Sequence, residues 1–346
     1  MQSSKQRHRL AWLSAILALG VVAAACGSDE DAEADSSGSG GGDVSGEVNV
    51  SGSSTVQPIS TAAGEAFQEA NADVTVNVDG PGTGDGFELF CNGETDISDA
   101  SRQIEQEEAD ACAANGIEYV ELQIAYDGIT VMTNPNNDAI ECLSFADLYA
   151  LIGPESEGFA RWSDGTAIAS ALGSSTQLPD ADLALTGPGT ESGTYDSFIE
   201  LALSGVAEER GLPEDQVETT RSDYDASPDD NVIIQNVEAS DTSLGWVGFA
   251  FAEEAGDQVT EIPVSAEAGD AATCVGPEAD TISDNSYPLS RPLFIYVSTA
   301  AADENAAVVP FVDFYLDNVN QFVEEGGYVT MPDDQVQATV TAWDGR

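Results

Sequence analysis

The apolar residues of this chain follow two patterns that take turns along the sequence. In some stretches they alternate or run continuously over a few positions, as in a strand, and in others they recur every three or four residues, as on a helix. The strand-like stretches are 48–50, 74–78, 95–98, 120–124, 129–132, 183–185, 245–251 and 293–297. The helical stretches are 59–70, 87–90, 105–115, 145–151, 195–202, 231–239, 308–323 and 332–343. This alternation predicts an α/β protein with parallel sheets, in which ligands bind at the carboxyl ends of the strands.

Three loops rich in glycine and small hydroxyl residues each connect a predicted strand to the first turn of a predicted helix. They are SGSSTVQP at 51–58, GPGTGDG at 80–86 and GPGTESGT at 187–194. The free N–H groups of a first helical turn and the positive end of the helix dipole attract an anion. A nucleotide-binding phosphate loop would place a Lys before its Ser or Thr, and these loops contain no Lys. We interpret the loops as holding an oxyanion, although an ordinary capped helix explains 187–194 equally well when that loop is taken alone.

The first 25 residues have the features of a processing signal. Lys5, Arg7 and Arg9 form a basic region, and the apolar run 10–25 is too short and too rich in small residues for a membrane span. The run ends in Ala-Ala-Ala-Cys, which resembles a bacterial lipoprotein signal with Cys26 as the lipid acceptor; an ordinary secretory signal is the alternative. The acidic Gly/Ser stretch 26–46 predicts a flexible tether. We therefore expect an extracytoplasmic protein anchored to the membrane by a lipid at Cys26.

Acidic residues dominate the composition. Without residues 1–25, which hold three of the nine basic residues, six arginines face 63 acidic residues, a net charge of −57. This part contains no Lys, and the single His of the chain is His8. A Schiff-base lysine, a Ser-His or Cys-His nucleophile and a His-ligated metal are thereby excluded, and so acidic a surface argues against nucleic acid as a partner. We expect a monomer that is not an enzyme and holds no metal or cofactor.

Five motifs occur in order across the chain. They are GSSTV at 52–56, the segments 80–87 and 91–102, AYDGITV at 125–131, GPGTESGT at 187–194, and RSDYDAS at 221–227. From 48 to 343 the chain resembles the phosphate-binding protein of the phosphate-specific ABC transporter, the PstS family. The resemblance implies a protein that captures inorganic phosphate and delivers it to a membrane permease.

The resemblance also implies a two-domain periplasmic-binding-protein type II fold with a two-segment hinge and a ligand cleft between the domains. We place the two crossings between domains near 126–128 and near 287–292. One domain is then 47–125 plus 288–346, and the other is 126–287.

Several of the ligand-binding positions of the family are matched in this chain. In the better-known members, phosphate is held by a Thr/Ser loop, a second Ser loop, an Asp, and an Arg that precedes Ser-Gly-Thr. The matching positions here are Ser54, Thr55, the N–H of Val56, Thr83, Ser192, Gly193 and Thr194.

Two family positions carry different residues. Ser101 stands where the family has Asp, and Pro188 stands roughly where it has Arg. Arg102 is therefore our candidate cation, because a guanidinium suits a tetrahedral oxyanion. Arg221 is a less certain candidate, which either closes the cleft or pairs with a surface acid such as Asp223.

The candidate hydrogen-bond acceptor is Asp127, at the first predicted crossing; a turn residue before Gly128 is an equally good interpretation. Asp85, Asp99 and Asp223 are alternative acceptors. At neutral pH phosphate still carries a proton and sulfate does not, so a buried carboxylate favours phosphate. A binding protein for sulfate or molybdate, and less so a magnesium-dependent phosphate-ester enzyme, are the alternative functions.

Four cysteines remain besides Cys26, namely Cys91, Cys112, Cys142 and Cys274. An even number in an exported chain favours two disulfides, and four cysteines allow three pairings. We favour Cys91–Cys112 and Cys142–Cys274, because each bond then stays within one of the proposed domains. Metal binding is the weaker alternative, since no CxxC occurs.

Overall fold

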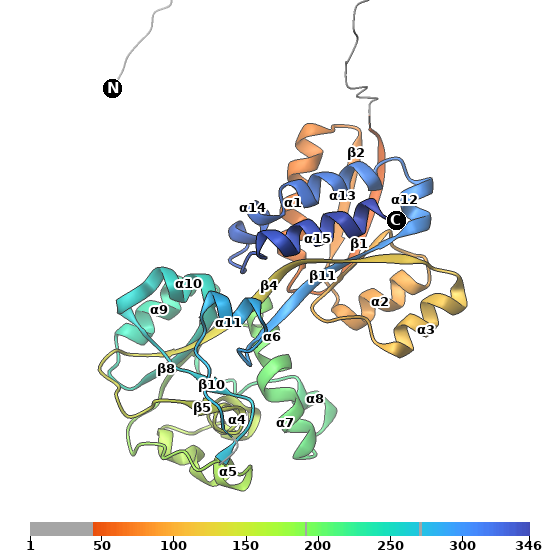
Figure 1. Ribbon diagram of the computed structural model, residues 1–346. Coiled ribbons are helices and arrows are strands. Elements are labelled where there is room, and N and C mark those ends of the chain that lie inside the picture. Colours follow the sequence, from red (N-terminus) through yellow and green to blue (C-terminus); the bar gives the residue numbers. More distant parts are fainter. Residues whose placement is uncertain (1–43, 191, 270–271) are drawn as a thin grey trace, which may run out of the picture. The chain divides into compact units, whose positions relative to one another are not determined.

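The computed structural model describes residues 44–190, 192–269 and 272–346 (Figure 1). The predicted signal 1–25, Cys26 and most of the predicted tether lie outside the described residues. Strands and helices alternate over most of the described chain, as the apolar pattern predicts. Within these ranges no helix combines the length and the apolar character that crossing a membrane requires.

In the described part of the chain, nine strands form one sheet in the order β2-β1-β3-β11-β4-β8-β6-β7, with β9 also paired to β4. β1 is parallel to β2 and β3, and β6 is parallel to β7 and β8, whereas β11 and β4 are antiparallel to their neighbours. The parallel pairing that the sequence predicts thus holds on either side of a central antiparallel pair. The strands are β1 Gly46–Gly52, β2 Val74–Asp79, β3 Ile97–Ala100, β4 Tyr119–Thr133, β6 Ala184–Gly187, β7 Asp225–Ala226, β8 Ser243–Gly248, β9 Thr260–Glu261 and β11 Ser290–Ser298, and a separate parallel pair consists of β5 Leu143–Ser144 and β10 Val264–Ser265.

The helices cover both ends of this sheet (Figure 1). The α-helices are α1 Gln57–Ala70, α2 Thr83–Cys91, α3 Gln106–Asn115, α4 Phe145–Ile152, α5 Thr166–Ala171, α6 Gly193–Phe198, α7 Ser204–Glu209, α8 Glu214–Val217, α9 Asp230–Glu238, α10 Phe249–Ala255, α11 Ala279–Ser283, α12 Thr299–Glu304, α13 Val308–Asp317, α14 Val319–Glu325 and α15 Asp333–Asp344. The short 3₁₀ turns are η1 Pro154–Ser156, η2 Trp162–Gly165 and η4 Gly256–Gln258, and a π-helical segment, η3 Ile199–Leu203, joins α6 to α7.

Two predicted elements differ from the structure. The predicted strand 245–251 ends at Gly248, and the helix α10 begins at Phe249. A short continuous apolar run does not distinguish a strand from a helix by its periodicity. The predicted helix 308–323 is interrupted at Asn318, where φ is −119°. The Asn318 side-chain amide donates to the Phe314 carbonyl oxygen at 2.8 Å, a local bond that competes with the helical pattern.

The strand β4 contributes to two separate hydrophobic cores. Leu122 and Ile124 of β4 belong to a core formed with β1, β2, α1 and α13–α15, whereas Ile129 and Val131 belong to a core formed with α4, α6, β8 and α10. We call the elements around these cores the first lobe and the second lobe. The domain boundaries proposed from the sequence stay a prediction.

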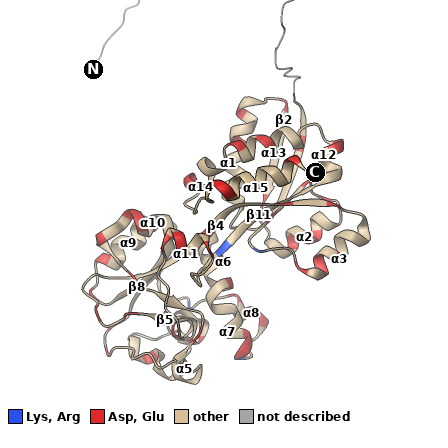
Figure 2. Ribbon diagram, in the orientation of Figure 1, with Lys and Arg blue, Asp and Glu red and all other residues tan. Residues whose placement is uncertain are grey.

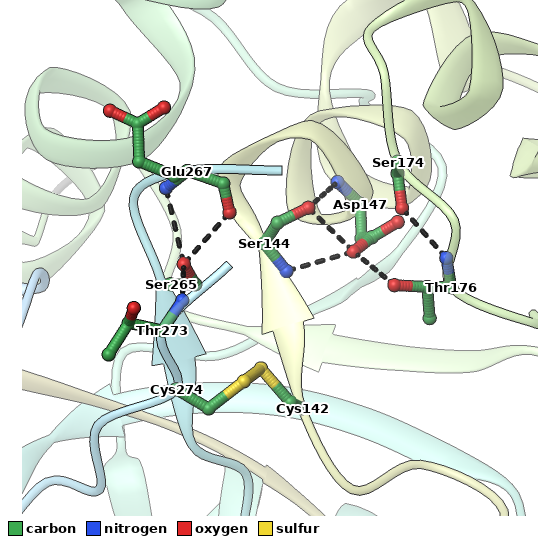
Figure 3. The surroundings of a disulfide bond; sticks show 9 residues. All are labelled: Cys142, Ser144, Asp147, Ser174, Thr176, Ser265, Glu267, Thr273 and Cys274. Carbon is green, nitrogen blue, oxygen red and sulfur yellow. Dashed lines mark hydrogen bonds between the residues drawn. A yellow bond between two sulfur atoms is a disulfide. The ribbon is translucent and has the colours of Figure 1, made fainter. Parts of the chain in front are cut away.

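Both bonds of the favoured disulfide pairing are present. Cys91–Cys112 joins α2 to α3, and Cys142–Cys274 joins the segment before β5 to the segment after β10 (Figure 3). Beside the second bond, Ser144 and Asp147 form the capping box of α4 that their spacing predicts (Figure 3). The Asp147 carboxylate accepts from the Ser144 N–H at 2.8 Å and from the Ser144 hydroxyl at 2.6 Å. These contacts hold the start of α4 in the second lobe.

Candidate functional site

Two of the three predicted loops, 51–58 and 80–86, line a cleft of about 570 Å³. On one side its lining comes from the first loop, from the second loop, and from the residues just after β3. On the other side it comes from α6 and the helical segments that follow. The lining residues are Ser53, Ser54, Thr55, Gly80, Pro81, Gly82, Thr83, Gly84, Asp85, Ser101, Arg102, Asp196, Ile199, Glu200, Ser204 and Glu218.

The first loop is folded tightly against the end of β3. Gly52 has φ of +149°, and a Cβ atom there would lie 2.0 Å from the carbonyl oxygen of Asp99, so a side chain does not fit. The Ser53 N–H donates to that carbonyl oxygen at 2.9 Å, and the Val56 N–H donates to the Ser53 carbonyl oxygen at 3.2 Å. The Val56 N–H, a candidate ligand donor from the resemblance, is therefore used in the turn. The loop contributes the hydroxyl of Thr55 to the site.

The second loop brings two hydroxyl groups together at the start of a helix. Thr83 is the first residue of α2, and its Oγ1 lies 3.0 Å from the Oγ of Ser101. The Ser101 N–H also donates to Thr83 Oγ1, at 3.2 Å. The first N–H groups of a helix have no acceptor within it, so α2 presents them toward the cleft together with these hydroxyls. Thr83 and Ser101, which are both candidate site residues, thus lie side by side.

The third loop caps its helix and packs against the first loop. Ser192 is the N-cap of α6, and its Oγ accepts from the N–H of Thr194 at 3.2 Å. A Cβ atom on Gly193 would lie 3.4 Å from both the carbonyl oxygen of Ser54 and the Cα of Thr55. The capped-helix interpretation therefore describes the loop correctly. Its close approach to the first loop positions the next residues of α6 beside the cleft.

A buried arginine lies where these loops meet. Arg291 is on β11, directly opposite Asp127 of β4 in the strand pairing. Its Nη2 donates to the hydroxyl of Thr55 at 3.0 Å and to that of Ser197 at 2.6 Å. Its Nη1 donates to Glu200 Oε2 at 2.5 Å, and its Nε lies 3.4 Å from Asp127 Oδ2. We call Thr55, Asp127, Ser197, Glu200 and Arg291 the Arg291 cluster.

Two carboxylates beside the cleft have raised pKa values. Burial raises the pKa of Asp127, and the positive charge of Arg291 opposes this shift. Burial also raises the pKa of Asp196, whose Oδ2 accepts from the Ser54 hydroxyl at 2.9 Å. Asp196 lines the cleft, whereas Asp127 lies behind the guanidinium of Arg291. Asp196 is therefore the carboxylate that is placed to accept a hydrogen bond from a protonated ligand in the cleft.

Comparison with known proteins gives the family of this chain. Residues 37–319 match the PBP superfamily domain. Protein SphX of Synechococcus elongatus is 38% identical, over 82% of this chain and 77% of its own length. Phosphate-binding protein PstS of Staphylococcus haemolyticus is 33% identical, over 92% of this chain and 91% of its own length. The chain belongs to the PstS family.

Solved structures agree with this membership. The crystal structure of a possible phosphate binding protein from Planctomyces limnophilus superposes with a TM-score of 0.76 at 35% identity, over 87% of this chain and 99% of its own. An ABC-type phosphate transport receptor from Vibrio cholerae shares the fold, with a TM-score of 0.57 at 23% identity, over 82% of this chain and 100% of its own. The α/β binding-protein fold that the resemblance implied is confirmed.

Arg102 and Arg221, the two arginines that the sequence suggested for this PstS-family site, make their strongest contacts with residues outside the cleft lining. Arg102 lines the cleft, but Nη1 and Nη2 each donate to the carboxylate of Glu108 at 2.8 Å. The hydrogen bonds to Glu108 raise the pKa of Arg102. Arg221 is buried in the second lobe, bonded to the carboxylate of Asp223 and to the Phe159 carbonyl oxygen. Pairing with Asp223 was the alternative that the sequence left open for Arg221.

Sequence reasoning missed four residues beside the cleft, namely Asp196, Ser197, Glu200 and Arg291. A signal for Arg291 was available, because it is one of six arginines after residue 25 and lies in the predicted crossing 287–292. No comparable signal marks Ser197, because its place opposite Thr55 depends on the folded chain. Figure 2 shows how sparse the basic residues are among the acidic ones. Over the described ranges, no group of three or more His, Cys, Asp or Glu side chains could hold a metal ion.

Proposed function

We propose that this protein captures inorganic phosphate in its cleft and delivers it to the permease of an ABC transporter. The observation that carries the proposal is the buried guanidinium of Arg291, bonded to two hydroxyl groups from opposite sides of the cleft. Relatives that are named phosphate-binding proteins align over nearly their whole length, which supports the same assignment. The proposed role is transport and not catalysis.

The proposed ligand contacts are hydroxyl groups, helix N–H groups and one guanidinium. Ser54, Thr55, Thr83 and Ser101 supply hydroxyls at the cleft, and Arg291 supplies the charge-assisted donor. Ligand hydrogen bonds to a charged donor are shorter and stronger than neutral ones. The predicted residues Val56, Ser192, Gly193 and Thr194 support these groups by shaping their loops, and Arg102 remains a proposed contact at the edge of the cleft. Arg221 is assigned a structural role in this proposal.

The two carboxylates beside the cleft are assigned different roles, and selectivity for phosphate is assigned to Asp196. Asp196 lines the cleft and is proposed to accept the hydrogen bond from the phosphate proton. Asp127, our candidate from the sequence, is proposed to orient Arg291, since it lies opposite that residue in the strand pairing. Sulfate carries no proton at neutral pH and would meet an unpaired carboxylate.

Calorimetric titration with phosphate, arsenate and sulfate tests the ligand. We expect heat from phosphate and arsenate and much weaker binding of sulfate. Binding of sulfate alone, or molybdate alone, would change the ligand class. Turnover of an aryl phosphate with added magnesium would favour the enzyme alternative.

A competition titration separates the two carboxylates. Asp196→Asn should weaken phosphate modestly and admit sulfate, because an amide donates as well as accepts. Asp127→Asn should weaken both anions together, since Arg291 loses its orientation. The reverse result would return the role of proton acceptor to Asp127.

The cellular location is proposed from the N-terminal sequence. We infer a monomeric extracytoplasmic lipoprotein, held at the membrane by a lipid on Cys26. Cys26→Ser should release the protein from the membrane fraction. If the wild-type protein is already found in the soluble fraction, the lipid anchor is wrong.

A further inference from the structure

Glu200 occupies an unusual place beside the cleft. It lies on the π-helical segment η3, between α6 and α7. π-Helical turns are rare and are often found at functional sites. Ile199, Ala202 and Leu203 of the same segment are buried in the core of the second lobe, whereas half of the Glu200 side chain is exposed. The backbone of η3 is thereby anchored, while the Glu200 side chain is in contact with solvent.

The Glu200 carboxylate is bound to the cation that we assign to the ligand. Its Oε2 accepts from Nη1 of Arg291 at 2.5 Å, and the Arg291 side chain is only 7% exposed. Both Glu200 and Thr55 line the cleft and both contact the guanidinium. Glu200 thus lies between the cleft lining and the guanidinium in the sense that it belongs to the one and is bonded to Nη1 of the other.

The two carboxylates on Arg291 differ in how readily they can leave. Asp127 is buried and is held opposite Arg291 by the pairing of β4 and β11. Half of the Glu200 side chain is exposed, so water can hydrate its carboxylate when it leaves Arg291, whereas the buried Asp127 has no such access to water. An anion that approaches Arg291 would therefore replace Glu200 and leave Asp127 in place.

Glu200 also affects the other acids beside the cleft. Burial is the main cause of the raised pKa of Asp196, and the negative charge of Glu200 adds to it. Burial is also the main cause of the raised pKa of Asp127; Arg291 is the strongest influence against that shift, and the negative charge of Glu200 again adds to it. Glu200 is thus close enough to act electrostatically on the whole site.

We propose that the Glu200 carboxylate competes with phosphate for Nη1 of Arg291 and so sets the affinity of the cleft. The inference rests on the proposed function. Phosphate displaces a carboxylate that already satisfies the guanidinium, and part of its binding free energy is used for this exchange. Glu200 therefore keeps phosphate binding weaker than the other residues of the Arg291 cluster would allow, which favours release of the ligand to a partner.

Titration of phosphate into the wild type, Glu200→Gln and Glu208→Gln tests the proposal. The amide of Gln is a weaker acceptor for Arg291 than a carboxylate. Glu200→Gln should therefore bind phosphate about five- to tenfold more tightly. Glu208→Gln is the matched control, because Glu208 is exposed on the adjoining helix α7 and lies outside the cleft lining. It removes the same charge and should leave the affinity within about twofold.

A second variant excludes a general charge effect. Glu200→Asp keeps the charge but shortens the reach to Arg291, so it should also tighten binding, by a smaller factor. The proposed competition would be overturned if both Glu200 variants kept the melting temperature of the wild type but bound phosphate equally well or more weakly. If Glu208→Gln tightened phosphate binding by the same factor, the effect would be one of bulk charge, and the proposal would be overturned as well. If the wild type binds neither phosphate nor arsenate, the proposed function itself is wrong.

Discussion

Arg221 and Arg291 both have almost completely buried side chains, with exposed fractions of 4% and 7%. Their surroundings differ in how the guanidinium is satisfied. Arg221 makes two short bonds to the carboxylate of Asp223, at 2.6 and 2.8 Å, and a third to the Phe159 carbonyl oxygen at 2.7 Å. Arg291 bonds to hydroxyl groups of two separate segments and to the half-exposed Glu200.

The difference shows that burial alone does not mark a binding cation. The partners of Arg221 include a backbone carbonyl group and a carboxylate two residues away, which a ligand cannot replace without disturbing the fold. The partners of Arg291 are all side-chain groups, and one of them, Glu200, is half exposed. A buried arginine is suited to binding when its partners are exchangeable and a cleft adjoins them.

The largest expected effect is on phosphate binding by Arg291→Gln. Loss of the charged donor should cost roughly 2–5 kcal/mol of binding free energy, the usual cost of truncating a buried charged partner. Calorimetry measures the change, with Arg221→Gln as the matched control that should retain affinity in its folded fraction. Near-normal binding by Arg291→Gln would remove Arg291 from the site.

Folding stability should show the opposite order. Arg221→Gln should lower the free energy of unfolding more than Arg291→Gln does. It leaves the Phe159 carbonyl oxygen and Asp223 without their charged donor, at a cost of roughly 2–4 kcal/mol. Urea unfolding measures this cost. Arg161→Gln, in an exposed ion pair with Asp180, should leave the unfolding midpoint nearly unchanged. Equal midpoints for Arg221→Gln and the wild type would contradict a structural role.

Within the described part of the chain, Asp99 is a buried carboxylate without an arginine partner, and it extends the comparison of buried charged groups to an acid. Burial raises the pKa of Asp99 from 3.8 to about 7, against a hydrogen bond from the Ser60 hydroxyl. The folded state therefore binds this proton more tightly than the unfolded state. The stability that results is fully present below pH 3.8 and is lost as the pH rises to about 7. The loss should be on the order of 4 kcal/mol.

Unfolding experiments on Asp99→Asn at a series of pH values check this expectation. The side chain of the variant does not ionise, so its stability should fall less steeply over the same pH range. The difference between the wild type and the variant is the informative quantity, because burial also raises the pKa of Asp230 to about 6. Parallel curves for the two proteins would show that Asp99 does not titrate in this range.

The smallest effect is expected for Arg102→Ala. Its guanidinium is 31% exposed and already holds Glu108, so phosphate affinity should fall by about 1 kcal/mol or less. The same titration as for Arg291→Gln measures it. A loss as large as that of Arg291→Gln would restore the interpretation that Arg102 is the main cation of the site.

The sequence by itself determined much of the secondary structure of this protein and its family. Apolar periodicity predicted most strands and helices, and small residues marked the three loops that open α1, α2 and α6. The favoured disulfide pairing is present, and five ordered motifs indicated the PstS family before any geometry was known. The periodicity and the loops depend on residues close together in the chain, and the order of the motifs survives without knowledge of distances. The disulfide pairing followed from the proposed domains, since Cys142 and Cys274 are 132 positions apart.

The Arg291 cluster was decided only by tertiary structure. The hydrogen bonds of Arg291 join it to residues 91, 94 and 236 positions away, and Thr55 meets Ser197 across 142 positions. Arg102 turned instead to Glu108, six positions away, and the Val56 N–H turned to its own loop. A hydrogen-bonding group takes whichever partner the packed chain brings within about 3 Å. Residue type predicts that a partner is needed, but the packing of β4, β11 and α6 determines which partner it is.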